Sequence, residues 1–204
     1  MFKSLKFFIK EMIDITLSMC IFIFFLPLML IISILIKIDS KGPIFFRQNR
    51  IGKNLKKFKI YKFRTMTYSK INTNESVMHL NEANGPVFKI KNDPRLTKIG
   101  KILRKYSIDE LPQILNIFLR QMNLVGPRPL PDYEVEEMDK RFARKRHQIR
   151  PGITGLWQVS EREKISSFKN WIRLDLDYIN NWSFILDFKI VFKTIFIILG
   201  GRGH

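Results

Sequence analysis

One segment near the N-terminus constrains the fold more than any other feature of the chain. Residues 15–36 read ITLSMCIFIFFLPLMLIISILI, 22 residues without a charged side chain. A helix needs about 20 apolar residues to cross the hydrocarbon core of a bilayer. The segment is too long for the apolar core of a signal peptide, and no cleavage site of small residues follows it. We therefore expect residues 1–38 to enter a membrane.

The charges on both sides of this segment leave two membrane topologies open. Both flanks are basic, and basic flanks favour the cytoplasmic side. A spanning helix would place one basic flank outside the cell, whereas a segment that turns back at Pro27 would keep both inside. Pro27 removes a backbone donor and disfavours helical geometry at Leu26, although spanning helices also accept proline. In either topology, the more basic C-terminal flank predicts that residues 39–204 form a domain on the cytoplasmic face.

The net charge narrows the class of partner. The 204-residue chain has 36 Lys and Arg against 18 Asp and Glu, a formal charge of +18. Such a balance attracts nucleic acid, anionic lipid or phosphorylated substrates. With 46% hydrophobic residues, the sequence is too apolar for a nucleic-acid-binding tail, and it carries no helix-turn-helix, RNA-binding strand or zinc signature. We therefore expect membrane lipids and phosphorylated substrates as partners, and no nucleic acid.

The residues after the apolar segment predict a small α/β domain, so the whole chain is expected to be α+β. Residues 44–47 and 58–66 predict a short β-hairpin. The second of these, FKIYKFRTM, alternates apolar and basic residues, which predicts one apolar and one cationic face. The expected helices are 95–105, 110–121, 134–147 and 168–181. Residues 67–94 and the proline-rich residues 124–134 are expected to lack regular structure.

The last apolar stretch has an amphipathic character. Residues 183–199 read SFILDFKIVFKTIFIIL, and Asp187, Lys189 and Lys193 interrupt the apolar pattern. A helix that lies in the membrane interface, with its lysines toward the headgroups, fits this pattern. A buried C-terminal helix of the domain core is the alternative, although the bulky residues exceed an ordinary core-facing stripe.

Two adjacent acids stand out in this basic chain. Residues 106–116 read YSIDELPQILN, with Asp109 and Glu110 ahead of a proline and an apolar helical pattern. The simplest interpretation is a helix start. Ser107 with Glu110 three residues later matches a capping box, and acids are favourable near a helix N-terminus.

Several basic residues converge on a phosphate-binding role. Guanidinium groups bind phosphate oxygens in a bidentate manner. Arg128 is the most informative of them, because the prolines of GPRP restrict its backbone. Arg150 precedes the glycine turn of RPGITG. The other candidates are Lys62, Arg64, Arg95 and Arg104.

These motifs, in this order, resemble the bacterial sugar transferase family, the monotopic phosphoglycosyl transferases. The matching segments cover nearly the whole chain: the apolar segment with Pro27, KIYKFRTM (59–66), NDPRLTKIGKILRKYSIDELPQILNIF (92–118), MNLVGPRP (122–129), RHQIRPGITGLWQV (146–159) and LDLDYINNWSFILDFKI (174–190). The resemblance implies that residues 1–38 form a helix-break-helix that re-enters the cytoplasm at the proline. Many relatives carry Ser-Pro at this bend, whereas this chain has Leu26-Pro27.

The resemblance also implies a reaction. Members move a sugar-1-phosphate from a UDP-sugar to a polyprenol phosphate such as undecaprenyl phosphate, and they release UMP. Asp109 would be the nucleophile that carries a covalent phosphosugar intermediate in a ping-pong mechanism, with Glu110 as its partner. The family needs Mg²⁺, and Asp109 and Glu110 would bind it. This agrees with general chemistry, because aspartate attacks phosphoryl groups and Mg²⁺ prefers one or two carboxylates with phosphate oxygens.

The remaining site residues follow from the same resemblance. Arg150 and His147 are weaker candidates for the nucleotide, and a solvated histidine at a helix end is an equal interpretation of His147. Trp157 and Trp182 are expected to be core or interface anchors. The expected phosphate-binding residues are Arg104, Arg128, Lys62, Arg64 and Arg95.

The expected location is the cytoplasmic face of a bacterial inner membrane, at the first membrane step of glycoconjugate assembly. The alternative is a non-catalytic membrane-associated scaffold of the same fold. The sugar, the pathway, the oligomeric state, the separate role of Glu110 and a cover formed by residues 67–90 stay open at the level of the sequence.

Overall fold

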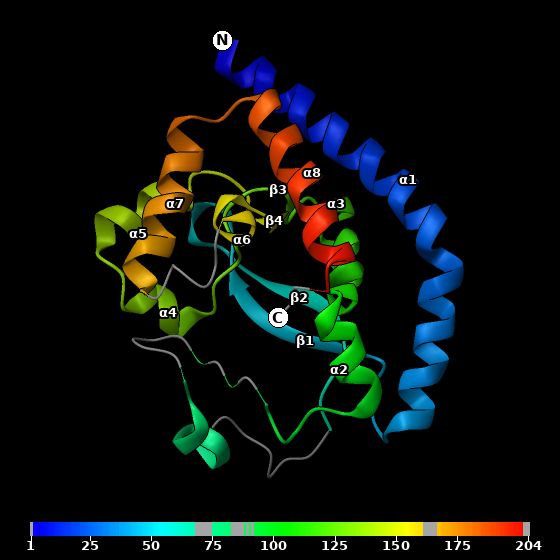
Figure 1. Cartoon of the computed structure of the whole chain (residues 1–204). Coiled ribbons are helices and arrows are strands. Elements are labelled where there is room, and N and C mark those ends of the chain that lie inside the picture. The colour runs from blue at the N-terminus through cyan, green and yellow to red at the C-terminus, as the bar shows by residue number, and fades with distance from the viewer. Residues whose placement is uncertain are drawn as a thin grey trace.

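The computed structural model describes residues 2–67, 75–82, 88, 90, 92–160 and 167–201. Helices and short strands are mixed, as the sequence predicted, with a long apolar helix along one edge (Figure 1). The α-helices are α1 (Phe2–Asp39), α2 (Lys98–Lys105), α3 (Ile114–Phe118), α4 (Asp132–Glu136), α5 (Lys140–Arg146), α6 (Leu156–Val159), α7 (Phe168–Asn180) and α8 (Phe184–Leu199). The strands are β1 (Phe45–Ile51), β2 (Lys57–Phe63), β3 (Asn123–Val125) and β4 (Gly152–Thr154), and the 3-10 helices are η1 (Lys53–Leu55), η2 (Glu75–Leu80) and η3 (Ile108–Gln113).

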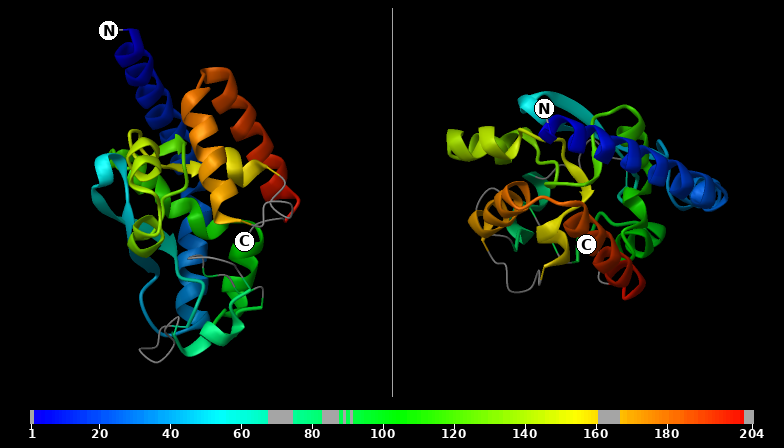
Figure 2. Two further views of the ribbon diagram at one scale, coloured as in Figure 1. Left: turned by 90° about the vertical axis from the view of Figure 1, so that its left-hand side faces the viewer. Right: turned by 90° about the horizontal axis from the view of Figure 1, so that it is seen from above.

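Helix α1 contains the whole apolar segment. It continues through Pro27, and its axis bends in its middle part (Figure 1). The break expected within residues 1–38 therefore takes the form of a bend in an unbroken helix, and re-entry into the membrane stays a prediction. Within the described residues, α1 alone is long and apolar enough to cross a membrane. Seen from above, it runs along one edge of the molecule (Figure 2).

The C-terminal half of α1 also belongs to the protein core. Its residues Met29, Ile32 and Ile36 are buried against Phe63 of β2 and Leu103 of α2. A second buried cluster contains residues of β2, α3, β3, α7 and α8. The apolar helix and the body of the protein thus share a core, so the membrane segment is packed onto the domain and is not a detached tether.

The hairpin of β1 and β2 is antiparallel and extends further than expected at β1. The predicted alternation holds at Phe58 and Ile60, which are both buried. It fails at Phe63, which is buried on the opposite face against α1. Because side chains alternate along a strand, Lys62 shares the face of Phe58 and Ile60. The expectation of one apolar and one cationic face was therefore wrong at the C-terminal end of β2.

Strands β3 and β4 form a parallel pair that joins two proline-containing segments. The backbone N–H of Gly126 donates to Thr154 O, and that of Gly152 donates to Pro127 O, both at 2.9 Å. A Cβ at Gly152 would lie 2.0 Å from Gly126 N, so only glycine fits there. Residues 124–134 were expected to be irregular, but they contain part of β3 and part of α4. The GPRP loop lies directly against the turn that begins at residue 150.

The other helices agree with the sequence in part. Helices α7 and α8 confirm the helices expected at 168–181 and 183–199. The expected helix 110–121 is a 3-10 helix, η3, followed by the short α3, and the expected helix 134–147 divides into α4 and α5. Helix η2 lies within the expected loop 67–94. Residues 68–74, 83–87 and 89, on which a substrate cover would depend, are outside the described residues.

Candidate active site

Asp109 and Glu110 lie in η3, directly after α2. Ser107 precedes them in the left-handed region, with φ of 53°, a conformation that is strained for a residue other than glycine. Its side chain forms no cap, so the expected capping box with Glu110 is not present. The two acids are instead buried, with exposed fractions of 7% and 6%. Acidic side chains are rarely buried without partners, so this pair requires more than a helix start as its explanation.

Glu110 is held by two cations. Lys62 Nζ donates to Glu110 Oε1 at 2.6 Å, and Arg128 Nη1 lies 3.7 Å from the same oxygen. Lys62 reaches Glu110 because it lies on the inward face of β2. Burial lowers the pKa of Lys62, while Glu110 acts to raise it. The carboxylate of Glu110 therefore orients two positive charges next to Asp109.

Asp109 has the properties of a nucleophile or a metal ligand. Its Oδ1 is buried and has no hydrogen-bond partner in the part of the chain that the structure describes. Burial raises the pKa of Asp109 from 3.8 to about 6, while Lys62 and Arg104 act to lower it and Glu110 to raise it. A pKa of about 6 leaves this buried carboxylate mostly ionised at neutral pH.

Arg104 places a positive charge close enough to Asp109 to act on its pKa. It extends from α2, and its Nε donates to Thr65 Oγ1 at 3.1 Å. Helix α2 approaches the end of β2 closely because Gly100 has no side chain, since a Cβ there would lie 2.0 Å from Thr65 O. The close approach of this helix to the hairpin sets the position of Arg104.

Arg128 is fixed through its own backbone. Its carbonyl oxygen accepts a hydrogen bond from Arg146 Nη2. Arg146 Nε donates in turn to Asp175 Oδ2 at 2.8 Å, and both side chains are 2% exposed. The guanidinium of Arg128 lies over the ring of Trp157, 5.7 Å from its centroid. An ion pair between α5 and α7 thus supports the loop that presents Arg128 to Glu110.

His147 is buried beside this ion pair, and its interpretation as a solvated residue was wrong. Its exposed fraction is 3%. Nδ1 lies 2.7 Å from Ala143 O, which makes Nδ1 the protonated nitrogen, and Nε2 lies 3.3 Å from Arg146 Nη1. Burial, together with the nearby charge of Arg146, lowers the pKa of His147 to about 4. Both ring nitrogens are engaged within the fold.

We expect His147 to make stability depend on pH. The unfolded chain takes up a proton on this residue near pH 6.5, whereas the native fold holds the ring neutral to about pH 4. The free energy of unfolding should therefore fall by about 3 kcal/mol from this residue alone as the pH drops through that window. Denaturant unfolding of wild type and His147→Gln at several pH values measures it. Parallel pH dependences in the two proteins would contradict a buried neutral His147.

Three of the predicted basic residues have other partners. Arg64 donates to three backbone carbonyl oxygens at the C-terminal end of α1. Arg95 binds the carboxylate of Asp93 through Nε and Nη2. Arg150 Nη1 lies 2.6 Å from Glu11 Oε1 on α1. These contacts give Arg64 and Arg150 structural roles between α1 and the body of the protein, and they tie Arg95 to its own turn.

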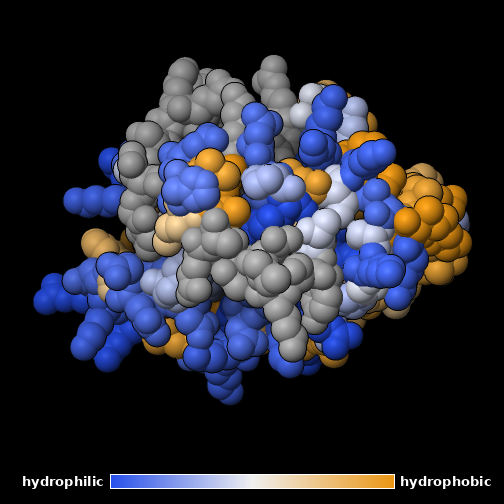
Figure 3. Space-filling view, turned by 90° about the horizontal axis from the view of Figure 1, so that it is seen from below, coloured by the Kyte–Doolittle hydropathy of each residue, from blue (hydrophilic) through white to orange (hydrophobic). Residues whose placement is uncertain are grey.

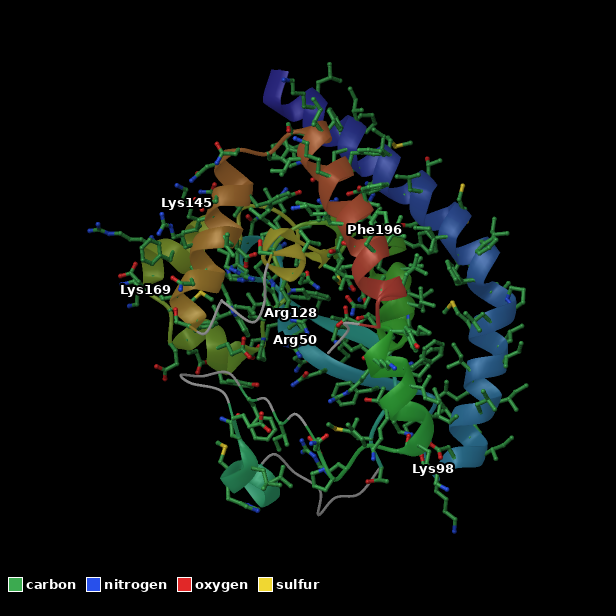
Figure 4. The ribbon with its side chains drawn as sticks, viewed as in Figure 1. Arg50, Lys98, Arg128, Lys145, Lys169 and Phe196 are labelled. Carbon is green, nitrogen blue, oxygen red and sulfur yellow. The ribbon has the colours of Figure 1, made fainter. Side chains whose placement is uncertain are left out.

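The sequence did not indicate one basic residue of the site, Arg50. In the hairpin register it stands opposite Phe58, on the inward face. The strand was expected to end at residue 47, so the alternation was not extended to Arg50. Figure 4 shows Arg50 and Arg128 next to each other in the interior, whereas Lys145 and Lys169 lie at the periphery. A small pocket at this position is lined by Arg50, Ile60, Lys62, Glu110, Gln113, Arg128, Pro129 and Ile153.

Comparison with known proteins shows the family of this chain. The family model described as bacterial sugar transferase matches residues 5–201. The chain is 44% identical over 162 residues to the galactosyl transferase CpsE of Streptococcus agalactiae, covering 79% of this chain and 36% of CpsE. It is 40% identical over 198 residues to the exopolysaccharide production protein ExoY of Rhizobium meliloti, covering 95% and 87%.

A third relative carries a reaction in its name. It is the UDP-N-acetylgalactosamine-undecaprenyl-phosphate N-acetylgalactosaminephosphotransferase of Aeromonas hydrophila, 41% identical over 200 residues that cover 96% of this chain and 45% of the relative. The chain thus spans most of ExoY and less than half of the other two proteins. Because the family model matches nearly every residue, the chain belongs to the bacterial sugar transferase family.

Proposed function

We propose that this protein transfers a sugar-1-phosphate from a UDP-sugar to undecaprenyl phosphate, giving undecaprenyl-diphosphate-sugar and UMP. The observation that carries the proposal is Asp109, a buried carboxylate whose Oδ1 has no partner among the described residues and whose neighbours are cations. The Aeromonas relative is named for this reaction with N-acetylgalactosamine. Because CpsE is named for galactose, the proposal does not specify the sugar.

The proposed reaction has two displacement steps. First, an oxygen of ionised Asp109 attacks the phosphorus that carries the sugar, the bond from this phosphorus to the bridging oxygen breaks, and UMP leaves with the electron pair. Second, a phosphate oxygen of undecaprenyl phosphate attacks the same phosphorus, the bond to Asp109 breaks, and the carboxylate is restored. One site can therefore serve a soluble substrate and a lipid substrate in turn.

The basic residues around Asp109 supply what phosphoryl transfer mainly requires, which is positioning and neutralisation of charge. Lys62 and Arg128 form ion pairs with Glu110, and Arg104 lies near Asp109. All of these groups are at least partly buried, where electrostatic interactions are stronger than in water. Glu110 has the role of holding Lys62 and Arg128 in place.

Mg²⁺ is the proposed cofactor, and the residues present fit it. The ion is commonly bound by one or two carboxylates together with water and phosphate oxygens. Asp109 and Glu110 would hold it, and the buried Oδ1 of Asp109, which has no partner among the described residues, agrees with this. The described residues contain no cluster of three or more His, Cys, Asp or Glu that could hold a metal ion. When bound, the ion supplies charge neutralisation at the substrate phosphates.

The membrane location is proposed from α1 and α8. In α8, Ile190 is buried, whereas Ile185, Phe188 and Phe196 are 68%, 71% and 58% exposed. Viewed from below, apolar atoms gather at the side where α1 lies, and hydrophilic residues cover much of the remaining visible surface (Figure 3). We place α1 and the outer face of α8 in the cytoplasmic leaflet of the bacterial inner membrane, with α1 re-entrant at its bend near Pro27.

UMP release tests the proposed function. Purified protein in detergent is mixed with Mg²⁺, undecaprenyl phosphate and a panel of UDP-sugars that includes UDP-galactose, UDP-glucose and UDP-N-acetylgalactosamine. Release of UMP that requires the lipid phosphate for turnover supports the proposal. Release of UDP with transfer of the sugar alone would contradict it, and so would hydrolysis at an unchanged rate without lipid.

A further inference from the structure

Arg50 is a half-buried residue of the pocket, and its hydrogen-bonding capacity is incompletely used. Its Nη2 donates to Gln48 Oε1 at 2.7 Å, and its Nη1 donates to Pro129 O at the longer distance of 3.3 Å. Its Nε is buried and has no partner within the described residues. A buried donor without a partner costs stability, so the fold retains an unfavourable group at the wall of the proposed active site.

The charges around Arg50 also favour an anion. Burial and the nearby charge of Arg128 lower the pKa of Arg50 to about 10, while Glu134 acts to raise it. Of the residues that line the pocket, Arg50, Lys62 and Arg128 are cations and Glu110 is the one acid. Glu110 is in contact with Lys62. A dianionic group in this pocket would relieve the repulsion between the two guanidinium groups.

The position of Arg50 is set by the GPRP loop. Its side chain contacts Pro129 O, and the next residue, Ile51, donates its backbone N–H to Leu130 O at 2.9 Å. The end of β1 and the loop that carries Arg128 are therefore joined by backbone and side chain. Two guanidinium groups reach one pocket from two elements that are fixed to each other.

We propose that Arg50 binds a substrate phosphate in the active site, acting with Arg128 as a pair of guanidinium groups around one phosphate or diphosphate. The inference rests on the proposed function and extends it to a residue of β1. Two substrates of the reaction carry this chemistry, the diphosphate of the UDP-sugar and the phosphate of the lipid. Measurements of UDP binding and of KM for undecaprenyl phosphate distinguish these two substrates.

The experiment compares Arg50→Met and Arg50→Lys with Arg47→Met in the full-length protein. Arg47 lies on the same strand but is exposed, with its guanidinium over the ring of Tyr61, so it is the matched control. Arg50→Lys keeps a positive charge without the planar fork of donors. Binding of UDP is measured by calorimetry and by the rise in melting temperature that UDP causes. KM for undecaprenyl phosphate is measured by UMP release.

We expect Arg50→Met to weaken phosphate binding by roughly 10- to 100-fold, as for a lost charge-assisted hydrogen bond, with Arg50→Lys in between and Arg47→Met like wild type. A weaker affinity for UDP assigns Arg50 to the donor diphosphate. Unchanged UDP binding with a raised KM for the lipid assigns it to the acceptor phosphate. Wild-type values in both assays, in a variant that melts normally, would overturn the inference.

A failure of the proposed function would give a different result. In that case the wild-type protein would release no UMP from any UDP-sugar. The UDP-binding comparison needs no turnover, so it still judges Arg50. An active wild type whose Arg50→Met variant is equally active and binds UDP and lipid equally well leaves the function standing and removes Arg50 from the site.

Discussion

Replacement of Asp109 by asparagine is expected to reduce UMP release by at least about 10⁴-fold, the scale seen when a nucleophile is removed from an active site. Asparagine has nearly the same shape but no ionised oxygen to attack phosphorus. Oδ1 of Asp109 is buried and has no hydrogen-bond partner among the described residues, and we propose that it is the oxygen available for this attack. Rapid-quench measurement of UMP formation from the UDP-sugar, with and without lipid phosphate, compares the variant with wild type.

The Asp109→Asn variant is also expected to be at least as stable as wild type in the presence of a chelator at pH 7.5. The native fold raises the pKa of Asp109 from 3.8 to about 6. Between these values the native state binds more protons than the unfolded state, so the contribution of Asp109 to stability falls as the pH rises. Above pH 6 the ionised form is a net cost that asparagine removes. Normal melting with lost turnover supports the nucleophile; full turnover in the folded variant would exclude it.

The proposed covalent intermediate can be tested directly with a labelled sugar. Wild-type protein mixed with a UDP-sugar labelled in the sugar should retain the label after denaturation, whereas Asp109→Asn should not. Glu110→Gln is the informative comparison, because Glu110 contacts Lys62 at 2.6 Å and is proposed to orient charge, not to carry the sugar phosphate. Label retained in Glu110→Gln and absent from Asp109→Asn would separate the roles of the two acids.

The acids and the GPRP loop could be recognised from sequence because each lies within a short contiguous motif. Their surroundings could not. The contact between Lys62 and Glu110 joins residues 48 positions apart, and no local pattern states which distant side chain a buried acid will meet. The capping box was a reasonable local prediction that failed, because burial of Glu110 against Lys62 replaced the bond back to the helix start.

The basic residues show how sensitive site prediction is to strand boundaries. Arg64 lies within the expected strand 58–66 and was assigned to phosphate, yet it stands one residue beyond β2 and donates to carbonyl oxygens at the end of α1. Arg50 lies three residues beyond the expected end of the first strand and faces the pocket. Side-chain direction reverses at every residue of a strand, so an error of a few residues in a boundary changes which basic residues face the site.

The membrane segment was predicted by composition, but its attachment was not. On α1, Lys10 Nζ lies 3.2 Å from Asp14 Oδ2, an ion pair four residues apart on the helix. Asp187, 177 residues from Lys10 in sequence, also accepts from Lys10 at 2.7 Å and from Tyr178 and Trp182. The one acid among the three charges that interrupt the apolar pattern of α8 therefore faces α1 and α7. A charge within an apolar stretch indicates that a partner exists, but not which one.

The buried pair of Arg146 and Asp175 should produce the largest effect on stability. Arg146→Met is expected to cost about 3–5 kcal/mol of unfolding free energy, because it leaves Asp175 buried without its counter-charge. Burial already raises the pKa of Asp175, and Arg146 is the group that acts most strongly against it. Arg146→Met also removes the donor to the carbonyl oxygen of Arg128. Denaturant unfolding and UMP release are both measured.

The double variant Arg146→Met/Asp175→Leu separates the two consequences of that change. Replacing both members of a buried pair with apolar residues commonly restores stability, so we expect the unfolding free energy to recover toward wild type. UMP release should stay low, because the carbonyl of Arg128 still lacks its donor and the GPRP loop is no longer held. Recovery of activity together with stability would show that the pair acts only on the fold. Recovery of stability alone would assign Arg146 the positioning of Arg128, and with it one of the charges that surround Glu110 and Asp109.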